Sequence, residues 1–204
     1  MHLPSEYGSE RDLVQALREP STRERAFRDA IQLWQRPLYG HLRRMLGNHD
    51  DAADALQDTL VKLVKNIHEF RGESALYTWL LSIANRTALD ALRKRQRDRL
   101  RWGDVALNRE EKAPTNIGET LEPLDDHAWN EWHGHDAWNE ASALQSLMAA
   151  VGLLPDRQRA VFVLRYFEAM PYKQLAQAMG VTESTVKALY HHAKAKLQIA
   201  LTSS

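Results

Sequence analysis

Apolar residues recur at intervals of three and four along most of the 204-residue chain, which is the pattern of amphipathic helices. The first such stretch, 27–46, contains Pro37, which is expected to kink or split the helix. A second helix is expected at about 50–67 and a third from about 75 into the basic run that follows, with Ser74 as its N-cap. No strand-length alternation and no internal repeat is found. The sequence therefore predicts an all-α fold.

The helical pattern is interrupted over residues 102–140, where prolines, glycines and ten acidic residues replace any sustained period. We interpret this segment as an acidic linker. It separates a first small helical domain, 22–101, from a second one, 141–204, and residues 1–21 are expected to form a loose N-terminal arm with one weak helix. Domains of about 80 and 60 residues bury few apolar groups, so docking onto a larger partner would stabilise them.

The formal net charge of zero conceals two basic blocks. Residues 1–103 hold 18 Lys and Arg against 14 Asp and Glu, residues 104–140 hold 2 against 10, and residues 141–204 hold 7 against 3. Two cationic domains that flank an acidic segment are typical of a protein that contacts nucleic acid at two places.

The chain contains no cysteine, which excludes disulfides and thiolate metal sites and fits a reducing compartment. The first residues lack the charged-then-apolar pattern of a secretory signal. No apolar run approaches the roughly 20 residues of a membrane span. We therefore expect a cytoplasmic protein without a membrane span.

The last third of the chain carries a helix-turn-helix pattern over 172–187. Ala176 is the small residue that the motif needs, Gly180 is its turn former, and Val186 is its apolar plug. Thr182 is expected to cap the second helix. The outer face is then left with residues suited to phosphates and base edges: Thr182, Ser184, Thr185, Lys187, Ala188, His191, His192 and Lys194. The alternative is an ordinary helical hairpin with a solvated polar face.

A second candidate surface combines aromatic and basic residues around the start of the third helix. Rings that stack on bases, beside cations that hold the backbone, suit single-stranded nucleic acid, and such a loop can also accept a flipped base. For Tyr77 and Trp79 the alternative is a place in the core, which we favour for Trp79. For the basic residues the alternative is a solvated face. The candidate residues are Phe70, Arg71, Ser74, Tyr77, Arg86, Arg93, Lys94 and Arg97.

Three carboxylates, Asp51, Asp54 and Asp58, fall on one face of the second helix together with Gln57. They do not converge as a pair of catalytic acids does, and no partner base is evident. They can cap the helix, bind a basic partner or be solvated, and the residues alone favour solvation.

The acidic linker contains residues of unusual type for a linker. Histidines and carboxylates are metal ligands in kind, but their spacing matches no metal motif, so we predict neither a metal site nor a cofactor. Tryptophans are rare in linkers, and three of them suggest that the segment docks into something when bound. The residues concerned are His127, His133, His135, Trp129, Trp132 and Trp138.

Taken together, these motifs resemble bacterial RNA polymerase sigma factors of the extracytoplasmic-function (ECF) type. Residues 51–58 resemble the helix with which that family docks on the clamp of core RNA polymerase. Residues 70–84 resemble the loop and helix that recognise and open the −10 promoter element. Residues 154–162 and the helix-turn-helix resemble the domain that reads the −35 element. The resemblance covers about 22–101 and 141–200.

The resemblance implies a promoter-specificity subunit, with core RNA polymerase and promoter DNA as partners and no catalytic activity of its own. Relatives of this type are often held inactive by an anti-sigma protein. It also implies that the acidic linker threads near the active-site cleft and RNA exit path of polymerase. The implied core-polymerase contacts are Asp51, Asp54, Gln57 and Asp58. The competing hypotheses are a stand-alone helix-turn-helix regulator that binds as a dimer and, more weakly, a metal hydrolase built on the linker histidines.

Three departures from the family pattern bear on promoter recognition. Asn85-Arg86 reverses the usual Arg-Asn order, so Arg86 occupies the position of the asparagine that contacts the melted strand. Residues 174–176 read Gln-Leu-Ala rather than Glu-Ile-Ala. The recognition helix carries lysine and histidine where arginine is usual, and lysine lacks the planar fork that reads guanine. We therefore expect weak or altered recognition of the upstream element.

Overall fold

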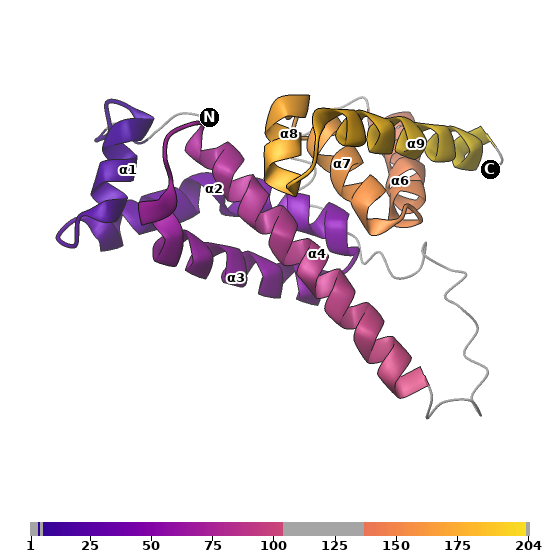
Figure 1. Cartoon of the computed structure of the whole chain (residues 1–204), viewed down its shortest axis with the longest axis horizontal. Coiled ribbons are helices and arrows are strands. Elements are labelled where there is room, and N and C mark those ends of the chain that lie inside the picture. The colour runs from indigo at the N-terminus through magenta and orange to yellow at the C-terminus, as the bar shows by residue number, and fades with distance from the viewer. Residues whose placement is uncertain (1–3, 5, 104–136, 203–204) are drawn as a thin grey trace.

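The computed structural model describes residues 4, 6–103 and 137–202, and within them the regular structure is helical (Figure 1). The prediction of an all-α fold is confirmed. The elements are α1 (Glu10–Arg18), α2 (Arg23–Leu46), α3 (His49–Asn66), the short 3-10 helix η1 (Ile67–Glu69), α4 (Leu76–Gly103), α6 (Ala137–Gly152), α7 (Asp156–Tyr166), α8 (Tyr172–Met179) and α9 (Glu183–Thr202).

Helix α2 forms the centre of the first domain, where it packs against α3 and α4. Its buried stripe follows helical spacing through Ala30, Trp34, Leu38 and Leu42. Of the two effects predicted for Pro37, a kink or a split, the split is wrong, because α2 continues through this residue. Pro37 removes one backbone hydrogen bond, and the buried side chains on either side of it hold the helix against the core.

Helix α3 begins after a turn that the sequence specifies well. Gly47 has a left-handed φ of 83°, and the Asn48 side chain accepts a 2.8 Å hydrogen bond from the backbone N–H of Asp51. The buried stripe of α3 is rotated from the one that apolar spacing predicts, which comprises Ala53, Leu56, Leu60, Leu63, Val64 and Ile67. Ala53 and Leu56 are only partly buried, whereas the fully buried positions are Ala52, Ala55, Thr59 and Leu63.

The helix expected in the N-terminal arm is present as α1, and it is packed against the first domain rather than loose. The side chain of Ser9 caps α1, and Leu13, Val14 and Leu17 are buried in the core of the first domain. Three apolar residues at helical spacing therefore suffice to anchor a nine-residue helix that would be unstable alone.

The second domain consists of α6 to α9, with α9 packed along α7 and α8. Pro155 and Pro171 stand immediately before α7 and α8, as expected of residues that start a helix without needing a backbone donor. Apolar spacing predicts a core face of α9 made of Val186, Leu189, Ala193 and Leu197. It is confirmed for Val186, Ala193 and Leu197, whereas Leu189 is only partly buried.

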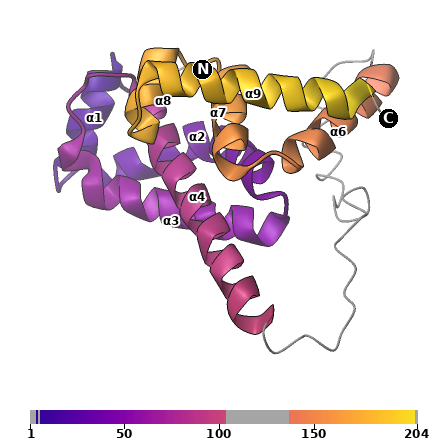
Figure 2. The ribbon, with the colours of Figure 1, turned by 45° about the vertical axis from the view of Figure 1, so that its right-hand side comes forward.

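The two domains pack directly on each other, although the sequence suggested separate modules on a linker. Helix α7 contacts α2, and α8 contacts α4. In both views of the molecule, Figures 1 and 2, α7 and α8 lie beside these two helices. The buried apolar residues of both domains belong to one cluster. The acidic linker, apart from its two ends, lies outside the described residues.

Candidate nucleic-acid interface

The turn of the helix-turn-helix is built as the sequence predicts. Gly180 ends α8 with a left-handed φ of 64°, a conformation that glycine adopts without steric cost. The hydroxyl oxygen of Thr182 then accepts a 3.2 Å hydrogen bond from the backbone N–H of Thr185, which caps α9. The cap prediction for Thr182 is confirmed, and the turn fixes the direction in which α9 leaves α8.

The outward face of α9 is open along its first three turns. Because Val186 and Ala193 face the core, the polar residues between them face outward. The Nζ atom of Lys187 lies 5.7 Å from the ring centroid of Tyr172, so its ammonium group makes a cation–π contact with that ring. The eight residues predicted for this surface, Thr182, Ser184, Thr185, Lys187, Ala188, His191, His192 and Lys194, are all exposed.

A second cationic surface follows α4. Arg93 pairs with Asp90 on its own helix at 2.8 Å, which fixes its direction and leaves it exposed. Asn85 is fully buried, whereas Arg86 is exposed, so the reversed order places arginine at the surface and asparagine inside. The predicted basic residues Arg86, Arg93, Lys94 and Arg97 are all exposed.

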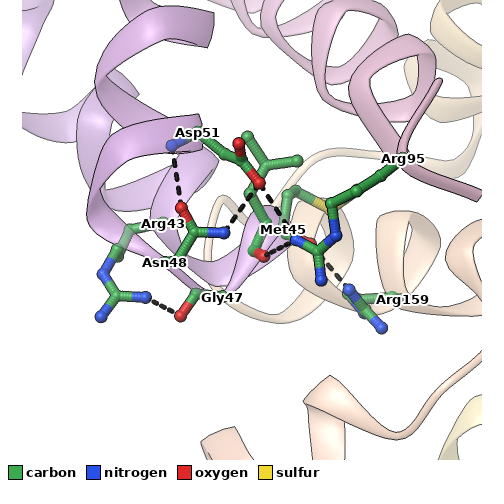
Figure 3. A network of polar contacts seen from close by, with 8 residues as sticks. Arg43, Met45, Gly47, Asn48, Asp51, Arg95 and Arg159 are labelled. Carbon is green, nitrogen blue, oxygen red and sulfur yellow. Dashed lines mark hydrogen bonds and ion pairs between the residues drawn. The ribbon is translucent and has the colours of Figure 1, made fainter. Parts of the chain in front are cut away.

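One arginine of the same basic run is structural. The guanidinium of Arg95 donates to the carboxylate of Asp51 at 3.0 Å and to the backbone carbonyl of Leu46 at 3.4 Å (Figure 3). Arg95 therefore ties the C-terminal half of α4 to the α2–α3 turn. Arg95 lies two residues from each of the exposed Arg93 and Arg97, and nothing in the sequence distinguishes it from them.

The loop before α4 is folded around its aromatic residue. Phe70 is buried, and its ring centroid lies 5.5 Å from that of Trp79, which is itself partly buried. This arrangement places Phe70 inside the loop rather than open on the surface where a base would stack. Arg71 is exposed, and Gly72 has a left-handed φ of 74° that turns the chain there.

Helix α1 forms hydrogen bonds to the backbone of this loop and of the start of α4. The sequence did not predict these contacts. The prediction that Ser74 caps α4 is wrong, because its hydroxyl donates to the carbonyl of Ala75. The backbone N–H of Leu76 donates instead to the carboxylate of Glu10 at 2.7 Å. Arg18 donates to the backbone carbonyls of Ile67 and Phe70. No local pattern predicts a cap supplied by a residue so far away.

The predicted −10 surface shares two cavities with the second domain. One, of about 320 Å³, has the loop residues and Arg86 on one side and α8 on the other. The second, of about 300 Å³, includes Asn85, Arg86 and Arg93 from α4 and Arg157 and Gly180 from the second domain. The side chains of Arg71, Ser74, Arg86 and Arg93 therefore face the second domain rather than open solvent alone.

Tyr77, the remaining predicted −10 residue, is turned toward the second domain. Its hydroxyl donates to the carboxylate of Glu168 at 3.2 Å. Burial raises the pKa of Tyr77 well above its ordinary value, and the neighbouring Glu168 carboxylate adds to that shift. Tyr77 is therefore a neutral donor at any physiological pH.

The acidic face of α3 is open to solvent. Asp54, Gln57 and Asp58 are exposed, and Val61 one turn further is 49 % exposed. Asp51 differs from the others, because it already pairs with Arg95 and accepts from the Asn48 side chain at 2.7 Å (Figure 3). The exposed three form the part of this face that is free to meet a partner.

Metal sites and membrane-spanning helices can be assessed only for the residues that the structure describes. No group of three or more potential metal-binding side chains occurs among residues 6–101 and 144–202. The linker residues His127, His133, His135, Trp129 and Trp132 lie outside the described part. Among the helices that the structure describes, none is long and apolar enough to cross a bilayer.

Comparison with known proteins accounts for both domains. The Sigma-70 region 2 family profile matches residues 30–98, and the Sigma-70 region 4 profile matches residues 144–197. The first match runs from within α2 to within α4, and the second runs from within α6 to within α9.

The most similar curated relatives include the ECF RNA polymerase sigma factor SigG of Mycobacterium tuberculosis, 34 % identical over 191 residues, covering 89 % of this chain and 50 % of the relative. The chain thus spans about half the length of SigG. The ECF RNA polymerase sigma factor SigW of Bacillus subtilis is 25 % identical over 173 residues, covering 85 % of this chain and 87 % of the relative.

Two solved structures share the fold. The sigma factor RpoE of Bartonella quintana, in complex with the anti-sigma factor NepR, gives a TM-score of 0.63 at 24 % identity and covers 86 % of this chain and 96 % of its own. CnrH in complex with the cytosolic domain of CnrY gives 0.61 at 21 % identity, covering 96 % of this chain and 98 % of its own.

Two helical domains, one with a helix-turn-helix and both with an exposed cationic surface, have the architecture expected of a DNA-binding protein of two modules. With the region 2 and region 4 profiles matched in order, the chain belongs to the sigma-70 family, and its relatives are of the ECF type.

Proposed function

We propose that this chain is a promoter-specificity subunit that binds core RNA polymerase, recognises the −10 and −35 promoter elements and directs transcription initiation. The observation that carries the proposal is the match of both sigma-70 regions in order, each with an exposed charged surface where a partner would bind. In this proposal the chain catalyses no reaction itself, because polymerase makes the RNA.

Region 2, which we place within residues 22–101, has two surfaces in this role. The exposed acids of α3, together with Gln57, contact the polymerase clamp as a negatively charged face that meets a basic one. The basic side of α4 and the loop 70–74 hold the melted strand of the −10 element. Arg86 contributes charge to the strand there, where the family pattern has asparagine.

Region 4, placed within residues 141–204, reads the −35 element with α9 in the major groove. Lys187 and Lys194 neutralise phosphates, and the hydroxyls of Ser184 and Thr185 bond phosphate or base edges near the helix start. His191 and His192 reach bases further along. The acidic linker, 102–140, joins the two regions and passes along the basic channels of polymerase.

We further propose that the chain acts in the cytoplasm, where its polymerase partner is found, and that an anti-sigma protein holds it inactive. One of the two solved structures of similar fold holds the sigma factor RpoE bound to the anti-sigma factor NepR, and the other holds CnrH bound to the cytosolic domain of CnrY. A dedicated inhibitor of this chain would be recovered by affinity capture from the organism that encodes it.

The test separates this proposal from a stand-alone regulator. Purified chain is applied to immobilised core polymerase, and in parallel to double-stranded promoter fragments without polymerase. The proposal predicts retention by core polymerase and promoter-specific binding only when polymerase is present. Specific binding of a dimer to a DNA site, with no retention by polymerase, would establish the regulator instead.

A further inference from the structure

The C-terminal half of α4 projects away from the other helices of the first domain (Figures 1 and 2). Among the side chains of α4 that the structure describes, Leu92 is the last that is buried. Of residues 93–101, which we call the basic stretch, all but Arg95 are exposed. The hydrophobic core therefore does not hold this part of the helix in place. The basic stretch carries the predicted −10 residues Arg93, Lys94 and Arg97.

Arg95 connects the basic stretch to the rest of the domain. Its Nη1 atom donates to the Asp51 carboxylate at 3.0 Å and to the backbone carbonyl of Leu46 at 3.4 Å (Figure 3). No other side chain of the basic stretch forms a hydrogen bond or ion pair with a different element in the described part of the chain. The orientation of the basic stretch therefore depends on the groups that bind Arg95.

Asp51 is itself held in place by its own helix. It lies in the first turn of α3, where the Asn48 side chain accepts from its backbone N–H at 2.8 Å and donates to its carboxylate at 2.7 Å. A carboxylate in the first turn is also favoured by the helix dipole. Leu46 ends α2, so its carbonyl lies at the negative end of that helix. One guanidinium nitrogen thus meets two acceptors that are fixed before it arrives.

Helical geometry then sets the direction of the neighbouring basic side chains. Each residue of an α-helix is rotated by about 100° from the one before it, so Arg93 and Arg97 lie about 160° from Arg95 around the axis of α4. Because Arg95 faces the α2–α3 turn, Arg93 and Arg97 face away from that turn, and both are exposed. Loss of the Arg95 bonds would release this orientation without uncovering a buried side chain.

The bond to Arg95 also makes Asp51 different from the other acids of α3. Asp54 and Asp58 are exposed, and neither forms an ion pair within the described residues. The charge of Asp51 is balanced by Arg95 at 3.0 Å. A balanced carboxylate adds little to the attraction between an acidic face and a basic partner. Asp51 is therefore poorly suited to contact polymerase and well suited to hold α4.

We propose that Asp51 is a positioning residue for −10 recognition and not a contact to polymerase. Through Arg95 it holds the basic stretch of α4 at a fixed orientation relative to α3, whose exposed acids meet polymerase. The inference rests on the proposed function for what these two helices bind. Once polymerase has bound α3, the basic side chains of α4 face the −10 strand without a further search for their orientation.

Asp51→Asn tests the proposal because charge and position predict opposite results. Loss of a negative charge near a DNA-binding helix should strengthen promoter binding if long-range attraction alone matters. Loss of the bond to Arg95 should weaken it. The measurement combines the full chain, core polymerase and a promoter fragment selected from a randomised library with the parent chain. The fragment carries 2-aminopurine in its −10 element, and the fluorescence of this base reports melting.

We expect the concentration of chain that gives half-maximal promoter opening to rise about threefold to fivefold in Asp51→Asn, the range of a partly exposed ion pair. Retention by core polymerase should stay within about twofold of the parent chain, because no polymerase contact is lost. Asp98→Asn makes the same change of charge at an exposed acid of α4 and should not weaken opening.

Variants of Arg95 test whether Asp51 acts through this residue. Arg95→Lys keeps a cationic donor and should retain most of the promoter opening, whereas Arg95→Gln should lose it. Arg99→Gln, at an exposed arginine one turn further along α4, measures the effect of lost charge alone. The double variant of Asp51→Asn with Arg95→Gln should be no weaker than Arg95→Gln, because both substitutions remove the same bond.

A second measurement needs no polymerase. Cysteines introduced at Lys65 on α3 and Leu100 on α4, both exposed in a chain without native cysteine, carry a pair of spin labels. The parent chain should give one narrow distance distribution. Asp51→Asn should broaden it, whereas Asp98→Asn should not. Helical circular dichroism retained in both variants excludes unfolding as the cause.

The two measurements together separate the possible outcomes. Unchanged distances in Asp51→Asn, or promoter opening as strong as that of the parent chain, would overturn the proposal. Loss of polymerase retention in Asp51→Asn would also overturn it and make Asp51 a polymerase contact. If the distances broaden as expected but the parent chain neither binds polymerase nor opens promoters, the proposed function fails and the orientation of α4 by Asp51 stands.

Discussion

The carboxylate of Glu10 accepts a 2.7 Å hydrogen bond from the backbone N–H of Leu76, 66 residues further along the chain. Helix α1 thereby supplies the N-terminal cap of α4, the helix that carries the predicted −10 surface. The loop that precedes α4 is held between this bond and the bonds of Arg18 to its backbone carbonyls. The position of the loop therefore depends on a helix that matches neither sigma-70 profile.

Replacement of Glu10 by alanine should lower the free energy of unfolding by about 1 kcal/mol. The substitution removes the carboxylate that accepts a hydrogen bond from the N-terminal end of α4. Urea unfolding followed by circular dichroism measures the change. The matched control is Glu24→Ala, which removes an acidic residue from the first turn of α2 with no comparable bond. Equal unfolding midpoints for the two variants would show that the bond from Leu76 contributes nothing.

The features that the sequence predicted well are those set by neighbouring residues. Gly180 and Thr182 specify the turn of the helix-turn-helix locally, because one needs a left-handed backbone and the other accepts from a donor three residues away. The exposed face of α9 followed from the burial of Val186 and Ala193 two helical turns apart. Helix faces and helix caps are both determined by residues that lie close together in the sequence.

The features that the sequence did not predict are long-range. Ser74 had the correct residue type for a cap, yet Glu10 fills that role because tertiary packing brings it closer to the free N–H of Leu76. Glu168 resembled any other acid in a loop, and only the fold brings it to Arg44 and Tyr77. Periodicity predicts which face of a helix is buried, but it does not predict which helices pack together. The packing of the two domains on each other could therefore not be predicted from local sequence patterns.

His41 should make the stability of the chain depend on pH. This residue is fully buried, and burial, with Arg44 beside it, lowers its pKa from 6.5 to about 3. Its contact with Glu168 at 3.8 Å is therefore not an ion pair at neutral pH. Because the unfolded chain takes up a proton below pH 6.5 and the folded chain does not, stability is full above that pH and declines as the pH falls toward 3.

The expected decline is up to about 1.4 kcal/mol for each pH unit within that window. Chemical unfolding of the parent chain and of His41→Leu at several pH values between 5 and 7.5 measures it. The variant should lose most of the slope, since leucine has no proton to gain. Identical slopes in the two proteins would place the responsible groups elsewhere.

Lys187→Ala and His192→Ala should each weaken binding of the polymerase complex to an upstream promoter element by about 1–3 kcal/mol. If Lys187 contacts phosphate, its loss should also reduce the dependence of affinity on salt by about one ion. Lys196→Ala, an exposed lysine further along α9, is the control. A footprint that neither substitution alters would remove α9 from the upstream contact.

Asp54→Lys should abolish retention by core polymerase and leave the melting temperature nearly unchanged, because Asp54 is exposed and its charge is reversed only at the surface. Glu24→Lys makes the same charge change on another exposed helix and should be retained normally. Normal copurification of the Asp54 variant with polymerase would count against the clamp contact.

Transcription in vitro from a library of randomised promoters, with core polymerase and the purified chain, tests the central claim most directly. The account predicts transcripts that require the chain and that come from templates sharing two short elements at a fixed spacing. Transcription no greater than that of core polymerase alone, or transcripts whose templates share no such pair of elements, would contradict it.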